Sequence, residues 1–422
     1  MEIQRELKQD IIERRRDRAR NAFGNIEDII LIGAGKPIPI PGGADQTFPF
    51  RPHPEYTWLT GRAREGGVLA FDPNDGWTLF EPTLTELEQV WGGGPHPVGR
   101  SLTELDEWLK AREGCGIKWL GVAKDAVSDK ELSERLLHAR RPKDEAELEF
   151  MRAAVHATAA GHAAAVQYIR PGVTERQVQI ELEAAFYRNG ADGVGYGTIV
   201  GSGPNSTQLH SEPGTRRMQD GDIIVLDAGG EVNGYTADVT RTLAASGKFN
   251  ADQQAIYDAV LRAQLLAIDA CKVGAEWGDV HLLAARSMAE SLHHMGVIRV
   301  GAEEAVENGI ITMFFPHGIG HMVGLGVRDA SGPYPGRAGD RKFAGIKLRM
   351  DLILDEGYIV TVEPGLYFNN ALLRNEKRRE KFKDVVDWAM IEPWIGNLGV
   401  RIEDNILVTK NGPVNLTSEI PK

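Results

Sequence analysis

The sequence contains only two cysteines, Cys115 and Cys271, among its 422 residues. They lie far apart and belong to no CxxC pattern, which argues against a disulfide framework and against a thiolate metal site. A chain with so few thiols suits a reducing compartment, so we expect a cytoplasmic protein.

Long apolar segments are also missing. No run approaches the roughly 20 residues that are needed to cross a bilayer. The N-terminal segment, MEIQRELKQDIIERRRDRAR, lacks the apolar core of a signal peptide. We therefore expect neither a membrane span nor a secretory signal.

The chain has no excess of positive charge. Its 48 Lys and Arg residues are outnumbered by 60 Asp and Glu residues, which gives a formal net charge of -12. This balance disfavours a nucleic-acid backbone or an anionic membrane as a partner. Two basic runs, residues 14–20 and 377–383, alternate with acids and helix formers, and we interpret both as solvated helix faces.

What is present is the composition of a folded protein, with 42% hydrophobic and 26% charged residues. The length favours two or three domains. Residues 1–140 are predicted to form a mixed α/β domain with strands in 28–35 and 66–71 and a long loop between 36 and 54. A helix is expected after residue 101, because Ser101 and Glu104 have the spacing of a capping box.

A hinge is predicted in the segment ARRPKDEAELEFMRAA, residues 139–154. Basic residues and Pro142 precede an acidic first turn, which is typical of the start of a long helix. We therefore expect a second domain to occupy residues 145–422.

This second part of the chain repeats itself. The first copy has an alanine-rich helix followed by RPGVTERQVQIELEAAFYRNG, in which Thr174 and Gln177 form a capping box and Gly190 ends the helix. The second copy has QQAIYDAVLRAQLLAIDACKVG followed by EWGDVHLLAARSMAESLHHMG, which ends at Gly296. Each copy is thus predicted to open with a pair of helices.

Two strand motifs follow each predicted helix pair. GDIIVLDAG matches GYIVTVEPG, and in both the acid comes six residues after the first glycine. GYTAD matches GVRIE, and there the acid follows the glycine by four residues. Chance similarity is the alternative, but two matches in the same order favour a repeat about a pseudo-two-fold axis. Such an axis would make Asp227 face Glu363 and Asp238 face Glu403 across one site.

Four carboxylates in one partly buried site need positive partners, because like charges raise one another's pKa values. Two divalent cations would neutralise them. A ligand set of oxygens with one imidazole is typical of Mn²⁺, Fe²⁺ or Co²⁺ sites rather than of zinc sites built from thiolates.

The imidazole is expected from FFPHGIGHMVGLGVRD, residues 314–329. His317 and His321 have the spacing of an HExxH zinc helix, but Gly318 and Gly320 disfavour a helix. A glycine-rich turn that brings backbone and imidazole close to a ligand fits better. A structural role for either histidine is the alternative.

Together these motifs make residues 145–422 resemble the pita-bread metallopeptidases that cleave the bond before proline, aminopeptidase P and prolidase. The resemblance is carried, in order, by LDAGGEVNGYTADVTRT, FFPHGIGH, TVEPGLY and GVRIEDNILVT. It implies an α/β (α+β) chain in which a smaller mixed α/β domain precedes a pita-bread catalytic domain with an internal pseudo-two-fold repeat.

The resemblance also implies a dinuclear metal centre. Asp227 and Glu363 would be terminal ligands, Asp238 and Glu403 would bridge the two ions, and His321 would complete the ligand set. Mn²⁺ is the first expectation, with Co²⁺, Fe²⁺ or Zn²⁺ as alternatives. Glu363 would also take the proton of the attacking water and pass it to the leaving proline nitrogen.

Further residues match positions near the family's substrate. His210, in GSGPNSTQLHSEP, and His317 match histidines that line the substrate site and stabilise the tetrahedral intermediate, although a loop or structural role is the alternative for each. Arg401 matches an arginine beside the site. A salt bridge to a ligand carboxylate is the alternative role for Arg401.

The segment FPFRPHPEYTWLTG, residues 48–61, resembles the N-terminal domain of aminopeptidase P. That resemblance implies a domain that restricts the cleft to short peptides and helps to build oligomers. A homodimer is the default on symmetry grounds, with a tetramer as the alternative.

The sequence departs from the family pattern at Arg328, where most relatives have a histidine. Arginine cannot act as acid or base, but its fork can grip a substrate carboxylate; alternatively it turns to solvent. Glu403 follows Glu363 by 40 positions, and this long connection is more like prolidase. Arg349 likewise stands where prolidases carry an arginine for the dipeptide carboxylate.

We therefore expect a dinuclear-metal peptidase that hydrolyses the Xaa-Pro bond at the N-terminus of short proline-containing peptides. A prolidase restricted to dipeptides is the alternative within the family. A metal-free pita-bread binding module and a creatinase-like hydrolase are disfavoured, because all five predicted ligands are retained. Methionine aminopeptidase is disfavoured by the additional N-terminal domain.

Overall fold

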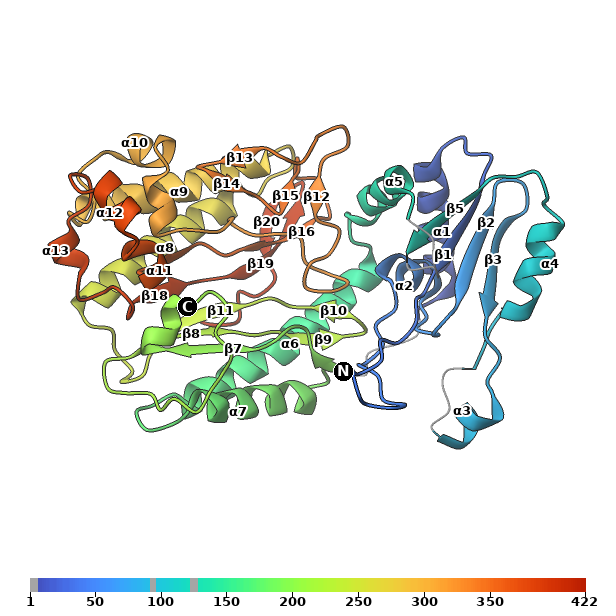
Figure 1. The fold of residues 1–422 in the computed structure, drawn as a ribbon, viewed down its shortest axis with the longest axis horizontal. Coiled ribbons are helices and arrows are strands. Elements are labelled where there is room, and N and C mark those ends of the chain that lie inside the picture. Colours follow the sequence, from blue (N-terminus) through green and yellow to red (C-terminus); the bar gives the residue numbers. More distant parts are fainter. Residues whose placement is uncertain (1–6, 92–95, 122–127) are drawn as a thin grey trace. The chain divides into compact units, whose positions relative to one another are not determined.

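The computed structural model describes residues 7–91, 96–121 and 128–422. The chain divides into two compact units, Met1–Arg140 and Arg141–Lys422, and each has its own core (Figure 1). No helix in the described part of the chain is long and apolar enough to cross a membrane.

The first unit is built on a mixed sheet with the strand order β4-β3-β2-β1-β5. Its strands are β1 (Ile29–Gly33), β2 (Val68–Asp72), β3 (Gly76–Glu81), β4 (Arg100–Ser101) and β5 (Ile117–Gly121). Its helices are α1 (Gln9–Phe23), α2 (Pro54–Thr60), α3 (Glu86–Trp91), the short 3₁₀ turn η1 (Leu102–Glu104), α4 (Leu105–Lys110) and α5 (Lys130–Arg140).

Strand β1 is buried along its whole length because helices cover both faces of the sheet. Ile29 and Leu31 belong to the cluster that includes Trp108 of α4. Side chains alternate between the faces of a strand, and on the other face the rings of Phe23 and Phe71 lie 5.7 Å apart. The predicted strands and the capping box before α4 are confirmed.

One prediction for this unit was wrong. The basic run in α1 is not a solvated face throughout, because only 1% of Arg15 is exposed. Its guanidinium donates a hydrogen bond to the backbone oxygen of Trp58 at 3.1 Å. A buried arginine needs hydrogen-bond partners of this kind. The partner here lies 43 positions away in the sequence, so the charge pattern of residues 14–20 could not indicate it.

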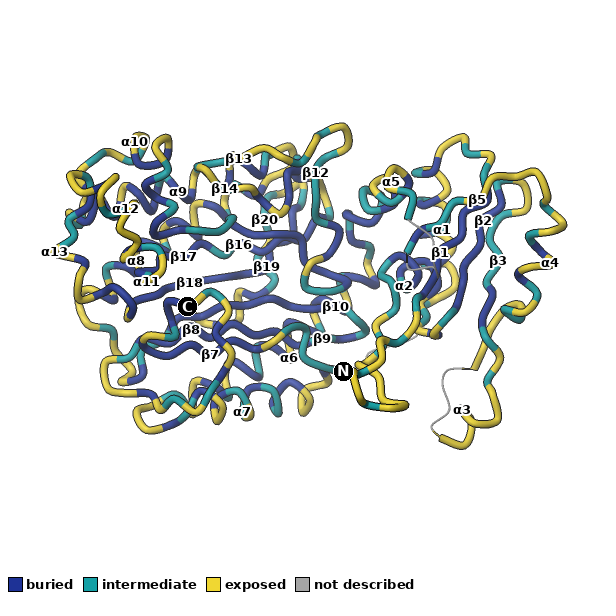
Figure 2. Tube along the Cα trace, in the orientation of Figure 1, coloured by how far each residue is buried: buried dark blue, intermediate teal, exposed yellow. Residues whose placement is uncertain are grey.

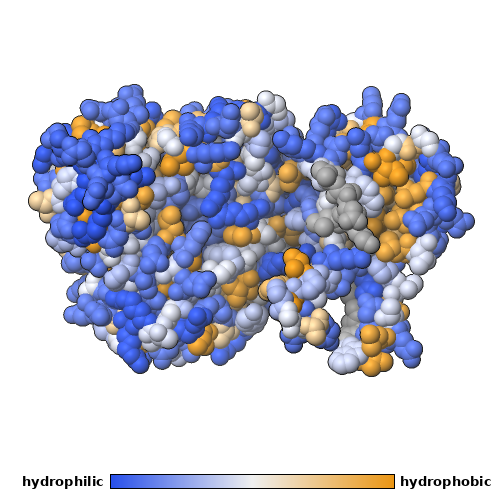
Figure 3. Space-filling view, in the orientation of Figure 1, coloured by the Kyte–Doolittle hydropathy of each residue, from blue (hydrophilic) through white to orange (hydrophobic). Residues whose placement is uncertain are grey.

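The second basic run agrees with the prediction. Lys377, Lys381 and Lys383 are exposed on and after α12 (Glu376–Lys381), a part of the second unit whose visible surface is strongly hydrophilic (Figure 3).

The second unit opens with α6 (Glu145–Tyr168) and α7 (Glu175–Arg188), and α8 (Ala251–Ala270) and α9 (Trp277–His294) open its second half. Asp144 caps α6 and Thr174 caps α7, each through a capping box. The predicted apolar face of α7, with Val178, Leu182 and Phe186, is fully buried.

Strands in the two halves pair in the same way. The first half has β6 (Gly193–Val194), β7 (Ile199–Ser202), β8 (Ile223–Asp227), β9 (Gly230–Val232), β10 (Tyr235–Thr236) and β11 (Thr240–Ala244). The second half has β16 (Ile359–Val362), β17 (Gly365–Tyr367), β18 (Gly399–Arg401), β19 (Asp404–Thr409) and β20 (Gly412–Asn415). In the first half β8 pairs antiparallel with β11, and the two strands between them, β9 and β10, pair with each other. In the second half β16 pairs antiparallel with β19, and β17 and β18 between them pair with each other.

The remaining elements are short and lie within the two halves, between the helices and strands already given. They are the 3₁₀ turns η2 (Gly203–Thr207) and η3 (Ile310–Met313), the helices α10 (Ala302–Glu307), α11 (Asn370–Leu373) and α13 (Trp388–Ile391), and the strands β12 (Gly332–Pro333), β13 (Lys342–Phe343), β14 (Ile346–Lys347) and β15 (Met350–Asp351). The central strands β8, β11 and β19 are mostly buried (Figure 2).

This pairing explains the repeat in the sequence. In the first half, Asp227 is the last residue of β8, and Asp238 lies two residues before β11 begins. In the second half, Glu363 directly follows β16, and Glu403 directly precedes β19. The turn between β9 and β10 consists of Asn233 and Gly234, both with positive φ, as a two-residue hairpin loop requires.

Candidate active site

A cavity of about 420 Å³ lies in the second unit. All ten residues that the sequence predicts for the site line it. They come from the strand ends just described and from the loops before β15 and around residues 210 and 317–328.

Asp227 is the last residue of β8 and is held by two donors. The hydroxyl of Tyr196 donates to Oδ1 at 2.7 Å, and Nη2 of Arg401 donates to Oδ2 at 2.6 Å. Burial nevertheless raises the pKa of Asp227, against the effect of the Arg401 charge. Additional positive charge beside this carboxylate would therefore be stabilising.

Asp238 and Glu403 approach each other from the two halves of the repeat. Glu403 Oε2 accepts a hydrogen bond from the Thr240 hydroxyl at 2.6 Å, whereas Oε1 is buried with no hydrogen-bond partner among the described residues. Burial and the neighbouring Asp238 and Glu363 carboxylates raise the pKa of Glu403 well above its usual range. This buried oxygen is therefore available to accept a bound cation.

The imidazole of His321 is oriented toward these acids. Its Nδ1 lies 2.9 Å from the backbone oxygen of Met322, which can only accept, so Nδ1 carries the proton. Nε2 lies 3.4 Å from Asp238 Oδ2 and 3.5 Å from Glu363 Oε1, and against the effect of burial these acids raise the pKa of His321. A bound cation would displace any proton on Nε2, and the ring, with Nδ1 fixed by the Met322 oxygen, would then bind the cation through Nε2.

A close backbone contact brings His321 to the acids. Thr361 in β16 donates its N–H to the oxygen of His321 at 2.8 Å, and Glu363 donates to the oxygen of Ile319 at 2.8 Å. A Cβ on Gly320 would lie 2.1 Å from the Thr361 oxygen, so only glycine permits this approach. The glycine-rich segment thus runs antiparallel beside β16, through backbone hydrogen bonds and one isolated bridge, rather than as a helix.

Glu363 follows β16 and retains partial access to the cavity, with 14% of its side chain exposed. Burial raises its pKa to about 7, although the His321 charge opposes the shift. Burial, with a smaller contribution from the Asp238 charge, thus makes the ionised form of Glu363 costly unless a cation lies beside it.

A chain of hydrogen bonds joins Arg401 to His317. Arg401 Nη1 donates to the Tyr367 hydroxyl oxygen at 2.8 Å, and that hydroxyl lies 3.1 Å from His317 Nε2. His317 Nδ1 lies 2.9 Å from the oxygen of Gly318. Burial lowers the pKa of His317 to about 3, so the ring is neutral and both its nitrogens have partners.

Three predicted substrate residues are exposed at the cavity wall. They are His210, Arg328 and Arg349. The two arginines add positive charge to a cavity whose floor holds four carboxylates. One cavity is therefore lined both by a group of four carboxylates and by two arginines.

The residues present fit a pair of divalent cations. The ligand atoms of Asp238, His321 and Glu403 lie within 4.8 Å of one another, and all three residues are buried. Asp227 and Glu363 line the same cavity. Carboxylate oxygens with one imidazole form a donor set for a cation such as Mn²⁺, Fe²⁺ or Co²⁺.

Sequence reasoning missed three hydroxyl groups of the site, those of Tyr196, Thr240 and Tyr367. Each contacts a predicted residue: Asp227, Glu403 and Arg401 respectively. Thr240 and Tyr367 lie inside the recognised motifs, but nothing in their spacing indicates the direction of a hydroxyl.

Comparisons with known proteins agree with this geometry. Residues 149–410 match the model of metallopeptidase family M24, and residues 12–106 match the N-terminal domain of aminopeptidase P. The chain therefore belongs to metallopeptidase family M24, and the prediction of a pita-bread domain preceded by a mixed α/β domain is confirmed.

Relatives over nearly the whole chain have aminopeptidase names. A protein named probable Xaa-Pro aminopeptidase from Botryotinia fuckeliana is 32% identical over 93% of this chain and 90% of its own length. Aminopeptidase P from E. coli, solved with the inhibitor Pro-Leu, has a TM-score of 0.80 at 26% identity and covers 99% of this chain and 96% of its own. Proline aminopeptidase P II from Yersinia pestis also has a TM-score of 0.80, at 26% identity, covering 99% of this chain and 97% of its own.

Proposed function

We propose that the chain is a metal-dependent aminopeptidase that releases the first residue of peptides with proline in the second position. The observation that carries the proposal is the meeting of Asp238, His321 and Glu403 within 4.8 Å of one another. It is supported by relatives that are named Xaa-Pro aminopeptidases over most of the chain. Because these relatives are not named dipeptidases, the prolidase alternative is not favoured.

In this proposal the metal centre uses all five predicted ligands. Asp227, Asp238, Glu363 and Glu403 would supply carboxylate oxygens and His321 would supply the nitrogen, with Mn²⁺ as the preferred ion. Such ions, when bound, would supply Lewis acidity that lowers the pKa of water and polarises the scissile carbonyl. The E. coli relative has also been solved in a zinc-substituted form, so the native metal requires direct analysis.

Proton transfer is assigned to Glu363. Its carboxylate takes a proton from the attacking water and delivers it to the proline nitrogen, which must be protonated as it leaves. His210, exposed at the cavity wall, donates a hydrogen bond to the carbonyl oxygen as negative charge develops there. His317 can share that role only after releasing Gly318 or Tyr367, so we assign the donor role first to His210.

Arg401 acts through its neighbours. It fixes Asp227 by an ion pair and Tyr367 by a hydrogen bond, which holds the proposed ligand and the wall of the pocket together. Arg328 and Arg349 face the cavity and can bind the C-terminal carboxylate of a short peptide.

We infer a cytoplasmic homodimer, with a tetramer as the alternative assembly. The low cysteine content supports the location, and closed two-fold symmetry is the commonest assembly of a single kind of chain. We assign to the N-terminal domain, residues 1–140, the restriction of the cleft to short peptides and a role in assembly, and we assign catalysis to residues 145–422.

The test is Mn²⁺-dependent hydrolysis across Xaa-Pro peptides of two to five residues. We expect release of the N-terminal residue from the longer peptides and loss of activity on chelation. Cleavage of the dipeptide alone would contradict the aminopeptidase proposal. Activity unchanged by chelation and by Asp238→Ala would contradict the dinuclear centre, and a purified protein without bound metal would favour a binding module.

A further inference from the structure

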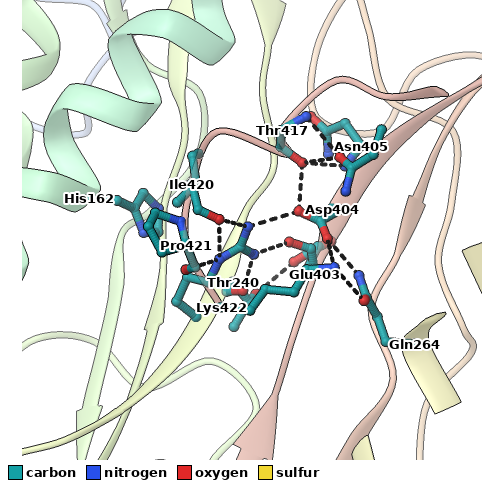
Figure 4. A network of polar contacts seen from close by, with 12 residues as sticks. His162, Thr240, Gln264, Glu403, Asp404, Asn405, Thr417, Ile420, Pro421 and Lys422 are labelled. Carbon is teal, nitrogen blue, oxygen red and sulfur yellow. Dashed lines mark hydrogen bonds and ion pairs between the residues drawn. The ribbon is translucent and has the colours of Figure 1, made fainter. Parts of the chain in front are cut away.

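Next to Asp238 and Glu403 lies a buried polar network around Arg241 and Asp404 that the proposed reaction does not use (Figure 4). Arg241, in β11, has only 3% of its residue surface exposed. It donates from Nη1 to the backbone oxygen of Glu403 at 2.6 Å and from Nη2 to Asp404 Oδ1 at 2.8 Å. One side chain of the first half therefore holds both the backbone of a predicted ligand in the second half and the acid beside it.

A side chain of the second half likewise holds the main chain of the first half, at Asp238. The side-chain amide of Asn405 donates to the backbone oxygen of Asp238 at 2.6 Å, and the Asp238 N–H donates to Asn405 Oδ1 at 3.0 Å. Arg241 thus fixes the main chain at Glu403, and Asn405 fixes it at Asp238. The main chain at the two acids cannot move apart unless these bonds break.

The chain from Thr417 to Lys422 closes over this reciprocal contact. Arg241 donates to the backbone oxygens of Ile420, from Nη2 at 2.7 Å, and Pro421, from Nε at 2.8 Å. The Thr417 hydroxyl donates to Asp404 Oδ1 at 2.7 Å and accepts from the Asn405 N–H at 3.1 Å.

Asp404 is the centre of the network. It is fully buried, and its Oδ2 accepts from Lys422 Nζ at 2.7 Å and from Gln264 Nε2 at 2.8 Å. Two cations and two neutral donors surround this one carboxylate, so its charge is fully compensated without any metal ion. It therefore differs from the four cavity acids, which lack sufficient positive partners.

We propose that Arg241, Asp404 and the segment Thr417–Lys422 form a clamp that sets the separation of Asp238 and Glu403 and so determines how tightly the two metal ions are retained. Rearrangement of a buried ligand by even a fraction of an ångström weakens a metal site, and partners behind ligands typically affect affinity by about 10–100-fold. The inference rests on the proposed metal centre. It assigns to these residues a positioning role and no contact with substrate.

The test compares metal binding by Arg241→Lys and Lys422→Met with that of the wild type. Lysine retains the charge of Arg241 but cannot contact Glu403, Asp404 and the two carbonyls together. Matched controls are Arg216→Lys, whose ion pair with Asp222 lies away from the cavity, and Lys410→Met, whose partner is Glu356.

Calorimetric titration of Mn²⁺ into the metal-free proteins, and the absorption band of the Co²⁺-loaded proteins, give readouts that are independent of activity. We expect Arg241→Lys to weaken Mn²⁺ binding at least about 10-fold and to change the Co²⁺ band, and Lys422→Met to do the same to a smaller extent, while both controls match the wild type. If Arg241→Lys fails to fold, Lys422→Met carries the test.

Variants that bind Mn²⁺ as tightly as the wild type, with the same Co²⁺ band, would overturn the clamp even if their melting temperatures fall. A wild-type protein that binds no Mn²⁺ or Co²⁺ would instead overturn the proposed metal centre, and the clamp with it. The two failures are therefore distinguishable.

Discussion

Arg401 and Asp227 form a buried ion pair in which Nη2 lies 2.6 Å from Oδ2. The two residues lie 174 positions apart, one from each half of the repeat. Burial raises the pKa of the Asp227 carboxylate, and the positive charge of the guanidinium opposes that shift. It therefore stabilises the metal-free site, in which carboxylates outnumber their positive partners.

Replacing Arg401 with methionine should destabilise the metal-free protein more than the metal-loaded one. Removal of one partner from a buried ion pair costs about 3–5 kcal/mol, and divalent ions would supply the lost positive charge. Denaturant unfolding with and without Mn²⁺ measures the difference. Arg216→Met should lose the same free energy of unfolding in both conditions, since its partner Asp222 is remote from the cavity. A deficit of Arg401→Met that Mn²⁺ leaves unchanged would contradict the prediction.

Replacing His321 with glutamine should reduce the number of Mn²⁺ ions bound from two to one and lower kcat/KM by at least ~100-fold. The reason is that Nε2 faces Asp238 and Glu363 while Nδ1 is fixed by a backbone carbonyl. Metal analysis after gel filtration checks the stoichiometry. His293→Gln is a matched control, because His293 also contacts a backbone oxygen through Nδ1 and lies outside the cavity. Retention of both ions by His321→Gln would exclude His321 as a ligand.

The main features of the fold could be predicted because they depend on local patterns. Capping boxes such as that of Thr174 and Gln177 are readable within four residues. The positions of the acids were predicted from repeated spacings, which the strand pairing of the two halves explains. Because the two copies are related by a pseudo-two-fold repeat, short sequence patterns in each copy predict which distant residues lie opposite each other in the structure.

The unpredicted features depend on contacts between distant segments. The hydroxyl of Thr240 donates to Glu403, which lies 163 positions later in the sequence. The buried Arg15 donates to the backbone oxygen of Trp58, which is also far away in the sequence. Neither contact changes the composition or periodicity of its own segment. The clamp around Asp404 is of the same kind, because it requires the start of β11, the start of β19 and residues 417–422 to meet.

The cavity arginines make a prediction about substrate length. Arg349→Met should raise KM about 10-fold for tripeptides with a free C-terminal carboxylate and leave kcat nearly unchanged, since one charged contact contributes about 1.4 kcal/mol to binding. The same tripeptides with an amidated C-terminus should be affected little. Steady-state kinetics on paired acid and amide substrates measures this. Lys347→Met, an exposed neighbour that does not line the cavity, is the control. Equal effects on acids and amides would show that Arg349 does not bind the carboxylate.

The first unit contains a pH-dependent ion pair that is independent of the metal site. Glu55 is buried and contacts Arg140 at 2.5 Å. Burial alone would raise its pKa, but the Arg140 charge and a hydrogen bond from His53 lower the pKa to about 2, from an ordinary value of 4.5. Because the folded-state pKa lies below the unfolded one, the stabilisation is complete above about pH 4.5 and is lost as the pH falls toward 2.

Replacing Glu55 with glutamine should therefore lower the free energy of unfolding by about 3 kcal/mol at pH 7, since one pKa unit corresponds to about 1.4 kcal/mol. The difference between wild type and variant should shrink progressively as the pH falls from about 4.5 toward 2. Denaturant unfolding at a series of pH values checks both the size and the direction. Glu86→Gln, at an exposed position of α3, should remain within about 0.5 kcal/mol of the wild type throughout. A Glu55→Gln deficit that stayed constant down to pH 2 would mean that its cause is lost packing rather than lost charge.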